Sequence, residues 1–328
     1  MKIKEYMLTT NEAKAVKSIV LEIEKKQENR LSWVLNNAKV IADKLPCGVK
    51  KFIYDFKVND KELGVCIKGN LVDDTSIGNT PSDFFTRDEK SICTNEEIMF
   101  ILYSELLGFT FGWNSIQNGN IINDIFPMKK DCKSATSAGS AYDFGMHTED
   151  AFHPYRADYL VLFGMRNPDE VATLISFLKP DDLSSETIES LFKKEFVVGA
   201  NVGQNVTEIE EYTSALFGCK SSPYLKVNMN NMRSLNQKSK EALFKLNQAL
   251  LNNTFKYRVQ QGDFLVLDNL KTVHGREKYV PRYDGTDRWL KRMQVTNDIR
   301  KSRDIRRSAS SRVLIANQML EKEAAFIK

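Results

Sequence analysis

The stretch GDFLVLDNLKTVHGREKYVPRYDGTDRWLKRMQV, residues 262–295, decides the fold class of this 328-residue chain. It holds two runs that are typical of strands, the apolar FLVLD and the mixed RWLKRMQV, and the residues between them include Gly, Pro, Asp and Asn, which favour turns. Three similar runs, FTFGW, DYLVLFGM and VATLISFL, follow one another from about residue 109 onward. Many short strands separated by turn signals favour a barrel or jelly roll over a parallel α/β sheet. No G-x-G-x-x-G or P-loop pattern is present.

The first part of the chain, residues 1–108, is expected to be rich in helices. Residues 9–27 carry apolar side chains at helical spacing, and either Thr10 or Asn11 is placed to cap that helix. The alternation of apolar and polar residues over 64–72 predicts a strand within this part.

Two further helices carry capping-box signals. Thr94 and Glu97 have the spacing of such a box, an apolar run follows them, and Gly108 is expected to end the helix. Ser234 and Gln237 have the same spacing before the helical pattern of a later segment.

The chain is expected to form a single domain over residues 1–328. Its expected parts are the helix-rich residues 1–108, a jelly-roll core over 109–300 with a helical insert at 234–253, and a C-terminal helix within 301–328. The polar stretch 201–222 is long enough to act as a lid over a site.

Composition narrows the classes of protein to which this chain can belong. A net charge of +4 and 27% charged residues give no electrostatic reason to expect a nucleic-acid partner. No apolar run is long enough for a membrane span, and the N-terminus lacks the apolar core of a signal peptide. Five cysteines without C-x-x-C spacing are typical of reduced thiols, so a cytoplasmic protein is expected. The oligomeric state is left open, a homo-oligomer included.

Two of the three histidines lie within MHTEDAFHPYRADY, residues 146–159. In an extended segment, His147 and Glu149 point to the same face, so an imidazole and a carboxylate lie side by side. The pattern alone is weak, since acidic residues are common in this chain. The zinc-protease signature H-E-x-x-H is absent. His153 lies outside the pattern and is expected to have a structural or supporting role.

The opening stretch supplies the remaining groups of a candidate site. His274 follows a predicted strand and turn, and Arg288 and Arg292 share one face of the strand predicted to begin near residue 288. Two inward guanidinium groups are costly unless anions pair with them, and bidentate pairing with carboxylates is the natural solution.

Two histidines and one carboxylate can bind iron(II) on one face and leave the other face open for a 2-oxo acid and dioxygen. Arg288 is placed to bind the far carboxylate of the 2-oxo acid, and Arg292 is placed to bind a carboxylate of a second substrate. Together these groups predict an iron(II)/2-oxoglutarate oxygenase. A β-barrel protein that binds iron and a 2-oxo acid without turnover is the alternative from another functional class.

The stretches HTEDAFHPYRADYLVLFGMRN and VHGREKYVPRYDGTDRWLKR resemble the clavaminate synthase-like branch of the iron(II)/2-oxoglutarate-dependent oxygenases, and its free amino-acid hydroxylases in particular. The resemblance covers about residues 90–300. It implies a mixed α/β fold whose core is a double-stranded β-helix, a cupin-like jelly roll, with flanking helices. It also implies iron(II), 2-oxoglutarate and oxygen as the reaction's requirements, with ascorbate helpful in vitro, and a small amino-acid substrate.

By motif position, the resemblance assigns roles to individual residues. It implies that the iron ligands are His147, Glu149 and His274, that Arg288 and Thr173 bind 2-oxoglutarate, that Arg292 binds the amino-acid carboxylate, and that Gln117, Ser137 and Glu149 lie near the substrate's backbone groups.

The expected substrate follows from one departure from the family pattern. The arginine hydroxylases of this branch carry a D-x-D pair that holds the guanidinium, whereas this chain has Asn228 and Asn230 in the corresponding stretch. Neutral amides pair less well than carboxylates with a charged guanidinium. The resemblance therefore favours free L-lysine, hydroxylated at C4 rather than C3, with arginine or another free amino acid as the alternative. The two asparagines also have a simpler explanation as turn formers.

Overall fold

The computed structural model describes residues 3–24, 30–59, 61–84, 94–179, 181–199 and 212–316. The helices are α1 (Thr10–Glu24), α2 (Arg30–Ala42), α3 (Cys47–Val58), α4 (Asp74–Ile77), α5 (Asn95–Leu107), α6 (Ser185–Leu191) and α7 (Gln237–Asn252). The strands are β1 (Lys4–Met7), β2 (Gly64–Lys68), β3 (Phe109–Trp113), β4 (Asn123–Ile125), β5 (Phe144–His147), β6 (Tyr159–Arg166), β7 (Thr173–Phe177), β8 (Phe196–Val198), β9 (Tyr212–Thr213), β10 (Leu216–Cys219), β11 (Ser222–Leu225), β12 (Met232–Ser234), β13 (Phe255–Tyr257), β14 (Phe264–Asp268), β15 (Thr272–Arg276), β16 (Trp289–Thr296) and β17 (Val313–Leu314).

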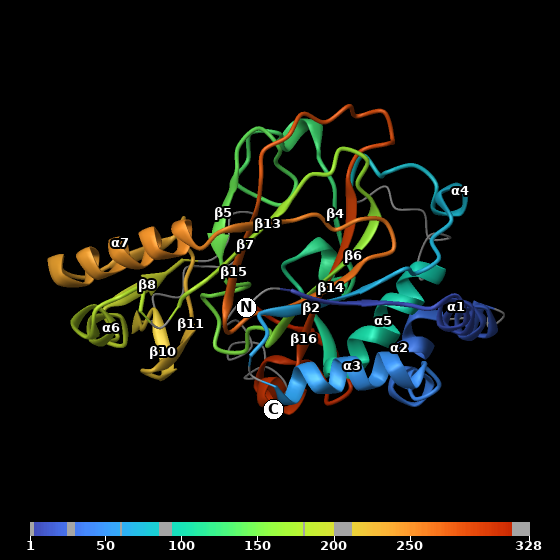
Figure 1. Cartoon of the computed structure of the whole chain (residues 1–328), viewed down its shortest axis with the longest axis horizontal. Coiled ribbons are helices and arrows are strands. Elements are labelled where there is room, and N and C mark those ends of the chain that lie inside the picture. Colours follow the sequence, from blue (N-terminus) through green and yellow to red (C-terminus); the bar gives the residue numbers. More distant parts are fainter. Residues whose placement is uncertain are drawn as a thin grey trace, which may run out of the picture.

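Two sheets form the core, which is the jelly roll that the sequence predicts. The larger sheet has the order β1-β2-β14-β6-β16-β3-β17, with β4 also paired to β16, and the smaller sheet has the order β13-β7-β15-β5. Most of their strand pairs are antiparallel, and in Figure 1 the two groups of strands occupy the middle of the molecule. Two small sheets, β12-β8-β9 and β10-β11, lie beside the smaller main sheet.

The alternation of side chains along the strands determines what lies between the sheets. Leucines of β6, β14 and β16 pack with Ile175 of β7 in one buried cluster, so the inward faces of the two sheets meet there. Residues of opposite parity, such as Val161 and Met293, belong instead to the larger cluster that includes the N-terminal helices. Because successive residues of a strand point to opposite faces, residues in step with Ile175 or Leu290 point into the jelly roll.

Helices cover the outer faces of both sheets. The apolar faces of α1, α2, α3 and α5 pack on the larger sheet, and these helices lie together at the lower right of Figure 1. On the other side, α6 and α7 pack over the outer face of the smaller sheet, where Met146 and Val273 join their cluster. No helix in the described parts of the chain combines the length and the apolar character that crossing a membrane requires.

The predicted helix starts are partly confirmed. Thr94 and Glu97 form the expected capping box at the start of α5, and Gly108 is its C-cap. The insert helix α7 is also present, but its capping box joins Asn236 and Ser239 rather than Ser234 and Gln237. Ser234 is instead the last residue of β12, where it pairs with β8, so strand pairing shifts the start of the helix.

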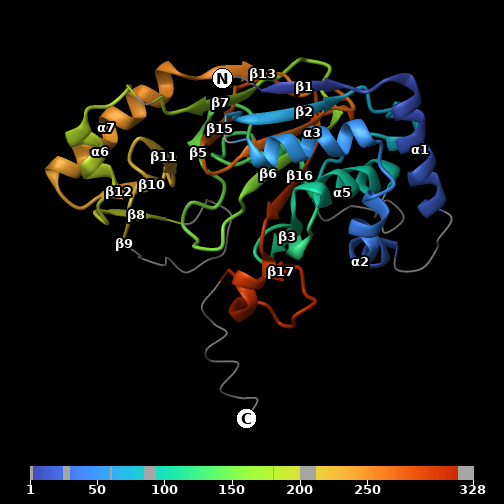
Figure 2. The same cartoon turned by 60° about the horizontal axis from the view of Figure 1, so that its bottom comes forward.

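The C-terminal part differs from the expected helix in the residues that can be described. Residues 299–305 form a 3-10 helix, and Val313–Leu314 form β17, which pairs in parallel with β3 (Figure 2). Leu314 is buried in a cluster with Phe111 and Trp113, so a tertiary contact overrides the local helical pattern. Residues 317–328 lie outside the described residues.

The expected lid also falls partly outside the described chain. Residues 200–211 are not described, and residues 212–222 contribute β9, β10 and the first residue of β11. Among the described cysteines, all four have free thiols, in line with the reduced state that the sequence predicts; they are Cys47, Cys66, Cys132 and Cys219.

Candidate active site

The three predicted metal ligands converge inside the jelly roll. His147 ends β5 and His274 lies in β15, and the two residues are direct partners in the register of the smaller sheet. Their ring centroids lie 4.4 Å apart, and the Nε2 atom of His274 lies 3.3 Å from Oε2 of Glu149. One possible ligand atom from each of the three buried residues lies within 4.8 Å of the others. Three side chains from two distant parts of the sequence therefore face one point.

Each of these side chains keeps a donor atom for a metal ion. The Nδ1 atom of His147 lies 2.8 Å from the backbone oxygen of Gly145; donation of a proton there leaves Nε2 as the donor atom. Oε1 of Glu149 accepts a hydrogen bond from Arg292, whereas Oε2 is buried without a hydrogen-bond partner. An unsatisfied buried carboxylate oxygen beside two imidazoles fits a divalent metal ion, and the two-histidine, one-carboxylate set suits iron(II).

The surroundings hold two of the predicted ligands, His147 and Glu149, in the protonation states that metal binding requires. Burial, together with the neighbouring His274, lowers the pKa of His147 to about 4, so its imidazole is neutral at neutral pH. Burial alone would raise the pKa of Glu149, but the Arg292 guanidinium and the nearby imidazoles of His274 and His147 lower it below its usual value. A neutral imidazole and an ionised carboxylate can bind a metal ion without first losing a proton.

Arg288 is a buried cation that lacks an anionic partner. It is 3% exposed, its Nε atom has no hydrogen-bond partner, and no ion pair to it is found among the described residues. Burial lowers the pKa of Arg288 to about 10, which still leaves the guanidinium charged at neutral pH. A buried, charged and unpaired guanidinium fits a carboxylate ligand, such as the distal carboxylate of 2-oxoglutarate.

Thr173 lies on the inward face of the smaller sheet, on the strand that pairs with the strand of His274. It pairs with Arg276 of β15, two residues beyond His274, and it is 3% exposed. Because Thr173 and Arg276 are in step with Ile175 and His274, their side chains point to the same inner face. Electrostatic contact with Arg276 also acts to lower the pKa of Arg288, so both arginines belong to one region.

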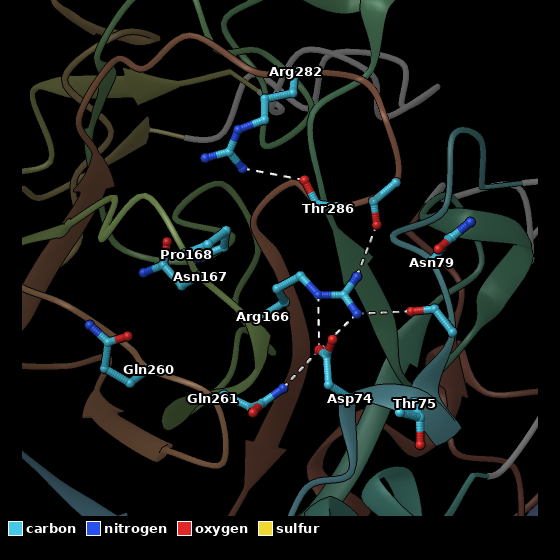
Figure 3. A pocket seen from close by; sticks show the side chains of 12 residues that line it. Asp74, Thr75, Asn79, Arg166, Asn167, Pro168, Gln260, Gln261, Arg282 and Thr286 are labelled. Carbon is cyan, nitrogen blue, oxygen red and sulfur yellow. Dashed lines mark hydrogen bonds and ion pairs between the residues drawn. The ribbon is translucent and has the colours of Figure 1, made fainter.

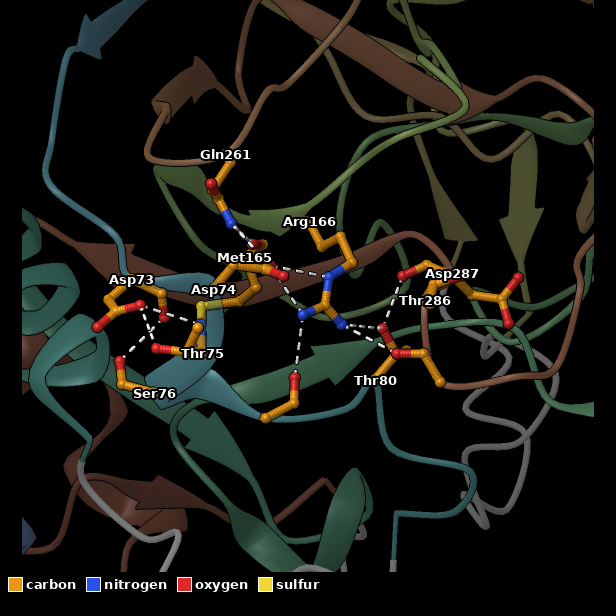
Figure 4. Close-up of polar contacts among 12 residues, drawn as sticks. Asp73, Asp74, Thr75, Ser76, Thr80, Met165, Arg166, Gln261, Thr286 and Asp287 are labelled. Atoms are coloured by element: carbon orange, nitrogen blue, oxygen red, sulfur yellow. Dashed lines mark hydrogen bonds and ion pairs between the residues drawn. The ribbon is translucent and has the colours of Figure 1, made fainter.

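The loop before Arg288 is fixed by a second arginine. Figure 4 shows that Arg166, the last residue of β6, donates to Asp74 of α4 and to Thr80, and it also donates to the backbone oxygen of Gly285. Thr80 in turn donates to the backbone oxygen of Asp287. These contacts join α4 to residues 285–287 and so fix the backbone that leads into Arg288.

A pocket of about 670 Å³ lies next to Arg166 (Figure 3). Its lining includes Asp74, Arg166, Gln261 and Arg282, but none of the three predicted metal ligands. The Arg166 guanidinium in this pocket is already hydrogen-bonded to Asp74. We therefore assign Arg166 and Asp74 a structural role and do not include them in the active site.

The predicted substrate-binding residues have diverse contacts. Arg292 points inward, and its guanidinium contacts Oε1 of Glu149 at 3.0 Å and Asn123 at 3.3 Å, while its buried Nε has no partner. The Gln117 side chain forms two hydrogen bonds with the backbone of Asp124, so it holds a loop together.

Ser137 is half-buried in the loop that precedes β5. The same loop is attached to the segment before Arg288, because the backbone of Tyr279 donates to the backbone oxygen of Ser140.

Asn228 and Asn230 extend the smaller sheet beside His147. Asn228 forms a β-bridge with His147, and the backbone N–H of Met229 donates to Met146. Oδ1 of Asn228 also accepts from the backbone N–H of Asn230, the turn-forming contact that the sequence allowed as an alternative. Asn228 therefore lies next to His147, Asn230 lies next to Gly145, and the two asparagines also shape a turn.

Several residues around Glu149 were not predicted from the sequence. Asn269 accepts from the backbone N–H of Glu149 at 2.7 Å and donates to its backbone oxygen at 3.2 Å. Asp150, the next residue, is fully buried and accepts from Gln294 and Trp113. Gln294 could have been predicted, because it lies two residues after Arg292 on the same strand and so points to the same inner face. No pattern in the sequence connects Trp113 or Asn269 with this site.

His153 has the structural role expected of it. It is 5% exposed, its ring lies 4.6 Å from that of Trp113, and its Nδ1 accepts from the backbone N–H of Tyr155.

Comparisons with known proteins agree with this geometry. The family model for "Taurine catabolism dioxygenase TauD, TfdA family" matches residues 201–294. Enduracididine beta-hydroxylase of Streptomyces hygroscopicus is 30% identical over 84% of this chain and 89% of its own length. L-ornithine/L-arginine 3-hydroxylase of Catenulispora acidiphila is 29% identical over 86% of this chain and 90% of its own length.

A solved structure extends the similarity to three dimensions. The crystal structure of the non-heme iron oxygenase OrfP in complex with Fe and alpha-ketoglutaric acid superposes with a TM-score of 0.89 and 34% identity, over 94% of this chain and 99% of OrfP. Clavaminate synthase 2 of Streptomyces clavuligerus is 28% identical over 82% of this chain and 85% of its own length. The chain therefore belongs to the clavaminate synthase-like branch of the TauD/TfdA family of iron(II)/2-oxoglutarate-dependent dioxygenases.

Proposed function

We propose that this dioxygenase hydroxylates an unactivated side-chain carbon of a free basic L-amino acid. The observation that carries the proposal is the pairing of two unsatisfied sites within one jelly roll: the free Oε2 of Glu149 and the unpaired guanidinium of Arg288. The first fits iron(II) and the second fits the distal carboxylate of 2-oxoglutarate. The substrate class is supported by the names of two relatives, an L-ornithine/L-arginine 3-hydroxylase and an L-lysine 3-hydroxylase.

Each residue of the proposed site has a defined role. His147, Glu149 and His274 hold the iron, which when bound supplies the oxidising chemistry driven by oxygen and 2-oxoglutarate. Arg288, with Thr173 beside it, binds the distal carboxylate of 2-oxoglutarate and so fixes how this cosubstrate is oriented. The orientation in which the amino-acid substrate binds then determines which of its carbons is nearest to the reacting centre.

Arg292 anchors the amino-acid substrate through its carboxylate. Its terminal nitrogens contact Glu149 and Asn123, whereas its buried Nε has no partner and is the N–H left to bind the substrate. Gln117 and Ser137 belong to nearby loops and complete the binding of the substrate's backbone groups. Gln117 acts by shaping its loop, because its amide group is engaged with Asp124.

We propose lysine as the first substrate because of the two asparagines. Asn228 forms a β-bridge with His147, and the side chain of Asn230 lies against Gly145, where the Cβ of any larger residue would come within 2.2 Å of Oδ1. Amide oxygens can accept hydrogen bonds from an ammonium group, but they offer no planar pair of charges to match a guanidinium.

Arginine is the second candidate, and the comparisons favour it. The lysine 3-hydroxylase of Catenulispora acidiphila is 26% identical and the lysine 4-hydroxylase of Niastella koreensis is 23% identical, below the 29% of the L-ornithine/L-arginine 3-hydroxylase. The same values bear on the position of attack. C4 is expected from the sequence resemblance, whereas the relatives named as 3- or beta-hydroxylases are more similar and favour C3.

The test is a screen of free amino acids with iron(II), 2-oxoglutarate, oxygen and ascorbate. The product is detected by mass as the gain of one oxygen atom, and succinate release is measured in parallel. We expect lysine to gain oxygen together with an equal amount of succinate, and NMR of the product then identifies C3 or C4. If arginine or ornithine is modified and lysine is not, the lysine assignment is wrong and the basic class survives. If no basic amino acid is modified, the proposed function is wrong.

A further inference from the structure

The residue after the carboxylate ligand has an unusual backbone conformation. Asp150 follows Glu149 directly and has a φ of 49°, in the left-handed region that non-glycine residues rarely adopt. Its side chain is completely buried. Such a conformation persists only where surrounding contacts fix it, and these residues often lie next to functional groups.

The contacts that fix Asp150 come from two neighbouring strands of the larger sheet, β3 and β16. Oδ2 of Asp150 accepts from Nε1 of Trp113 on β3 at 2.7 Å and from Nε2 of Gln294 on β16 at 2.5 Å. Trp113 Nε1 also lies 2.9 Å from Oε1 of Gln294, and β3 and β16 are paired strands. The exposed fractions of Trp113, Asp150 and Gln294 are all 2% or less.

Gln294 connects this group to the metal ligand. Its Nε2 atom lies 3.5 Å from Oε1 of Glu149, the same oxygen that Arg292 contacts at 3.0 Å. Residues 292 and 294 therefore act on one oxygen from one face of β16. The other oxygen, Oε2, points toward His274 and has no hydrogen-bond partner.

We infer that Trp113, Asp150 and Gln294 form a positioning network that fixes the Glu149 carboxylate with Oε2 toward the metal, and that this network sets the affinity of the site for a divalent metal ion. The inference rests on the proposed iron site but not on the identity of the amino-acid substrate. Residues that orient metal ligands in this way typically change metal affinity or activity by about 10–100-fold when they are removed.

The main variant is Gln294→Leu, which removes the amide group while keeping a side chain of similar size. The second variant is Trp113→Phe, which removes the indole N–H and keeps an aromatic ring against Phe152 and His153. Thr296→Val is the matched control. It removes a hydrogen bond from the same strand, to Asp158, without touching the network.

The measurement is the dissociation constant for Mn(II), by anaerobic calorimetric titration of the full chain, with the EPR spectrum of the bound ion as a second readout. Gln294→Leu is expected to weaken Mn(II) binding by about 10–100-fold and to alter the EPR spectrum, and Trp113→Phe to act in the same direction. Thr296→Val is expected to bind Mn(II) within about twofold of the unmodified protein, because it lies outside the ligand contacts.

The outcomes separate this inference from the proposed function. If the unmodified protein binds Mn(II) and Gln294→Leu binds it equally tightly, the network has no positioning role and the iron site stands. If Gln294→Leu does not fold, the same test is applied to Trp113→Phe, and unchanged Mn(II) affinity in that variant contradicts the positioning role. If the unmodified protein binds neither Mn(II) nor iron(II), the metal site itself is wrong and the inference fails with it.

Discussion

His147 and His274 are direct partners across β5 and β15, and the neighbours of each residue determine its chemistry. The backbone oxygen of Gly145 engages Nδ1 of His147, and Glu149 lies within 3.3 Å of His274. The third histidine, His153, packs against Trp113 outside this group. His153 therefore provides a control for substitutions of the two histidines that are proposed to bind the metal.

Replacing either of the two histidines proposed to bind the metal should abolish turnover. In His147→Ala and His274→Ala we expect no succinate above background, because two ligands on one side of the ion cannot hold it as three do. His153→Gln should retain succinate formation, since a glutamine can still accept from Tyr155. Coupled succinate and oxygen measurements test all three variants; full activity in His274→Ala would contradict the assignment.

Replacing Arg288 should act mainly on 2-oxoglutarate. Truncation of one partner of a buried charge pair costs about 2 kcal/mol or more, so we expect Arg288→Ala to raise the KM for 2-oxoglutarate by at least roughly 30-fold. The exposed Arg258, which is paired with Glu170, provides the control variant Arg258→Ala. An unchanged KM for 2-oxoglutarate in Arg288→Ala, with the control behaving normally, would show that another cation binds the cosubstrate.

At the residue scale, the sequence predicts the proposed metal ligands but not the residues that contact them. His147 and Glu149 are recognisable because an i, i+2 spacing places them on one face. Asn269 and Trp113 act on Glu149 and Asp150 from more than 30 residues away, and their contacts exist only once the strands have paired. No local pattern encodes such contacts.

Among the elements, α5 shows how local signals and packing combine. Its capping box at Thr94 and Glu97 fixes the start, and nearly every side chain of the helix is buried between the larger sheet and the other N-terminal helices. Lys291 of β16 also forms a buried ion pair with Glu97. The helix therefore supports the strand that carries Arg292 without reaching the site itself.

Removing the cap of α5 should lower stability and leave substrate binding unchanged. Thr94→Ala is expected to cost about 1 kcal/mol, because it leaves a backbone N–H at the helix start without its acceptor. The control Ser185→Ala lies at an exposed first-turn position of α6, whose cap is Ser184. Thermal unfolding with parallel KM measurements tests this prediction. Equal melting temperatures for the two variants, or a changed KM for 2-oxoglutarate in Thr94→Ala, would contradict it.

At the element scale, strands and helices with strong periodicity were predictable, and those created by tertiary pairing were not. The strands β3, β6, β7, β14 and β16 all coincide with runs recognised in the sequence. The strand β17 does not, because only its pairing with β3 and the burial of Leu314 select an extended conformation there. The start of α7 was misplaced for a similar reason, since Ser234 is used by β12.

For the molecule as a whole, His153 makes stability depend on pH. Burial lowers the pKa of His153 from its usual 6.5 to about 4. Because the folded state holds this imidazole neutral, its contribution is present above pH 6.5 and is lost as the pH falls toward 4. The shift corresponds to at most roughly 3 kcal/mol of unfolding free energy.

The pH dependence can be measured by thermal unfolding of the unmodified protein and of His153→Gln between pH 7.5 and pH 4.5. We expect the melting temperature of the unmodified protein to fall more steeply with decreasing pH, because the glutamine cannot take up a proton in the unfolded state. Parallel curves over the whole range would show that His153 does not contribute to this dependence.

The architecture of the whole molecule follows from its pattern of short strands, but the closure of the jelly roll does not. Alternation along β6 and β14 predicts two faces for each strand, and the structure shows that one face meets Ile175 of the smaller sheet. The order in which the strands pair depends on contacts between distant segments, such as β2 with β14. Motif resemblance supplied this topology, which periodicity alone could not.

The most direct test of the account is an anaerobic titration of the protein with iron(II) followed by 2-oxoglutarate, monitored by visible absorption. We predict a weak charge-transfer band that requires both iron(II) and 2-oxoglutarate and that is absent in His274→Ala. A protein that develops no band under these conditions, or a His274→Ala variant that develops the same band as the unmodified protein, would contradict the assignment of His147, Glu149 and His274 as the iron site.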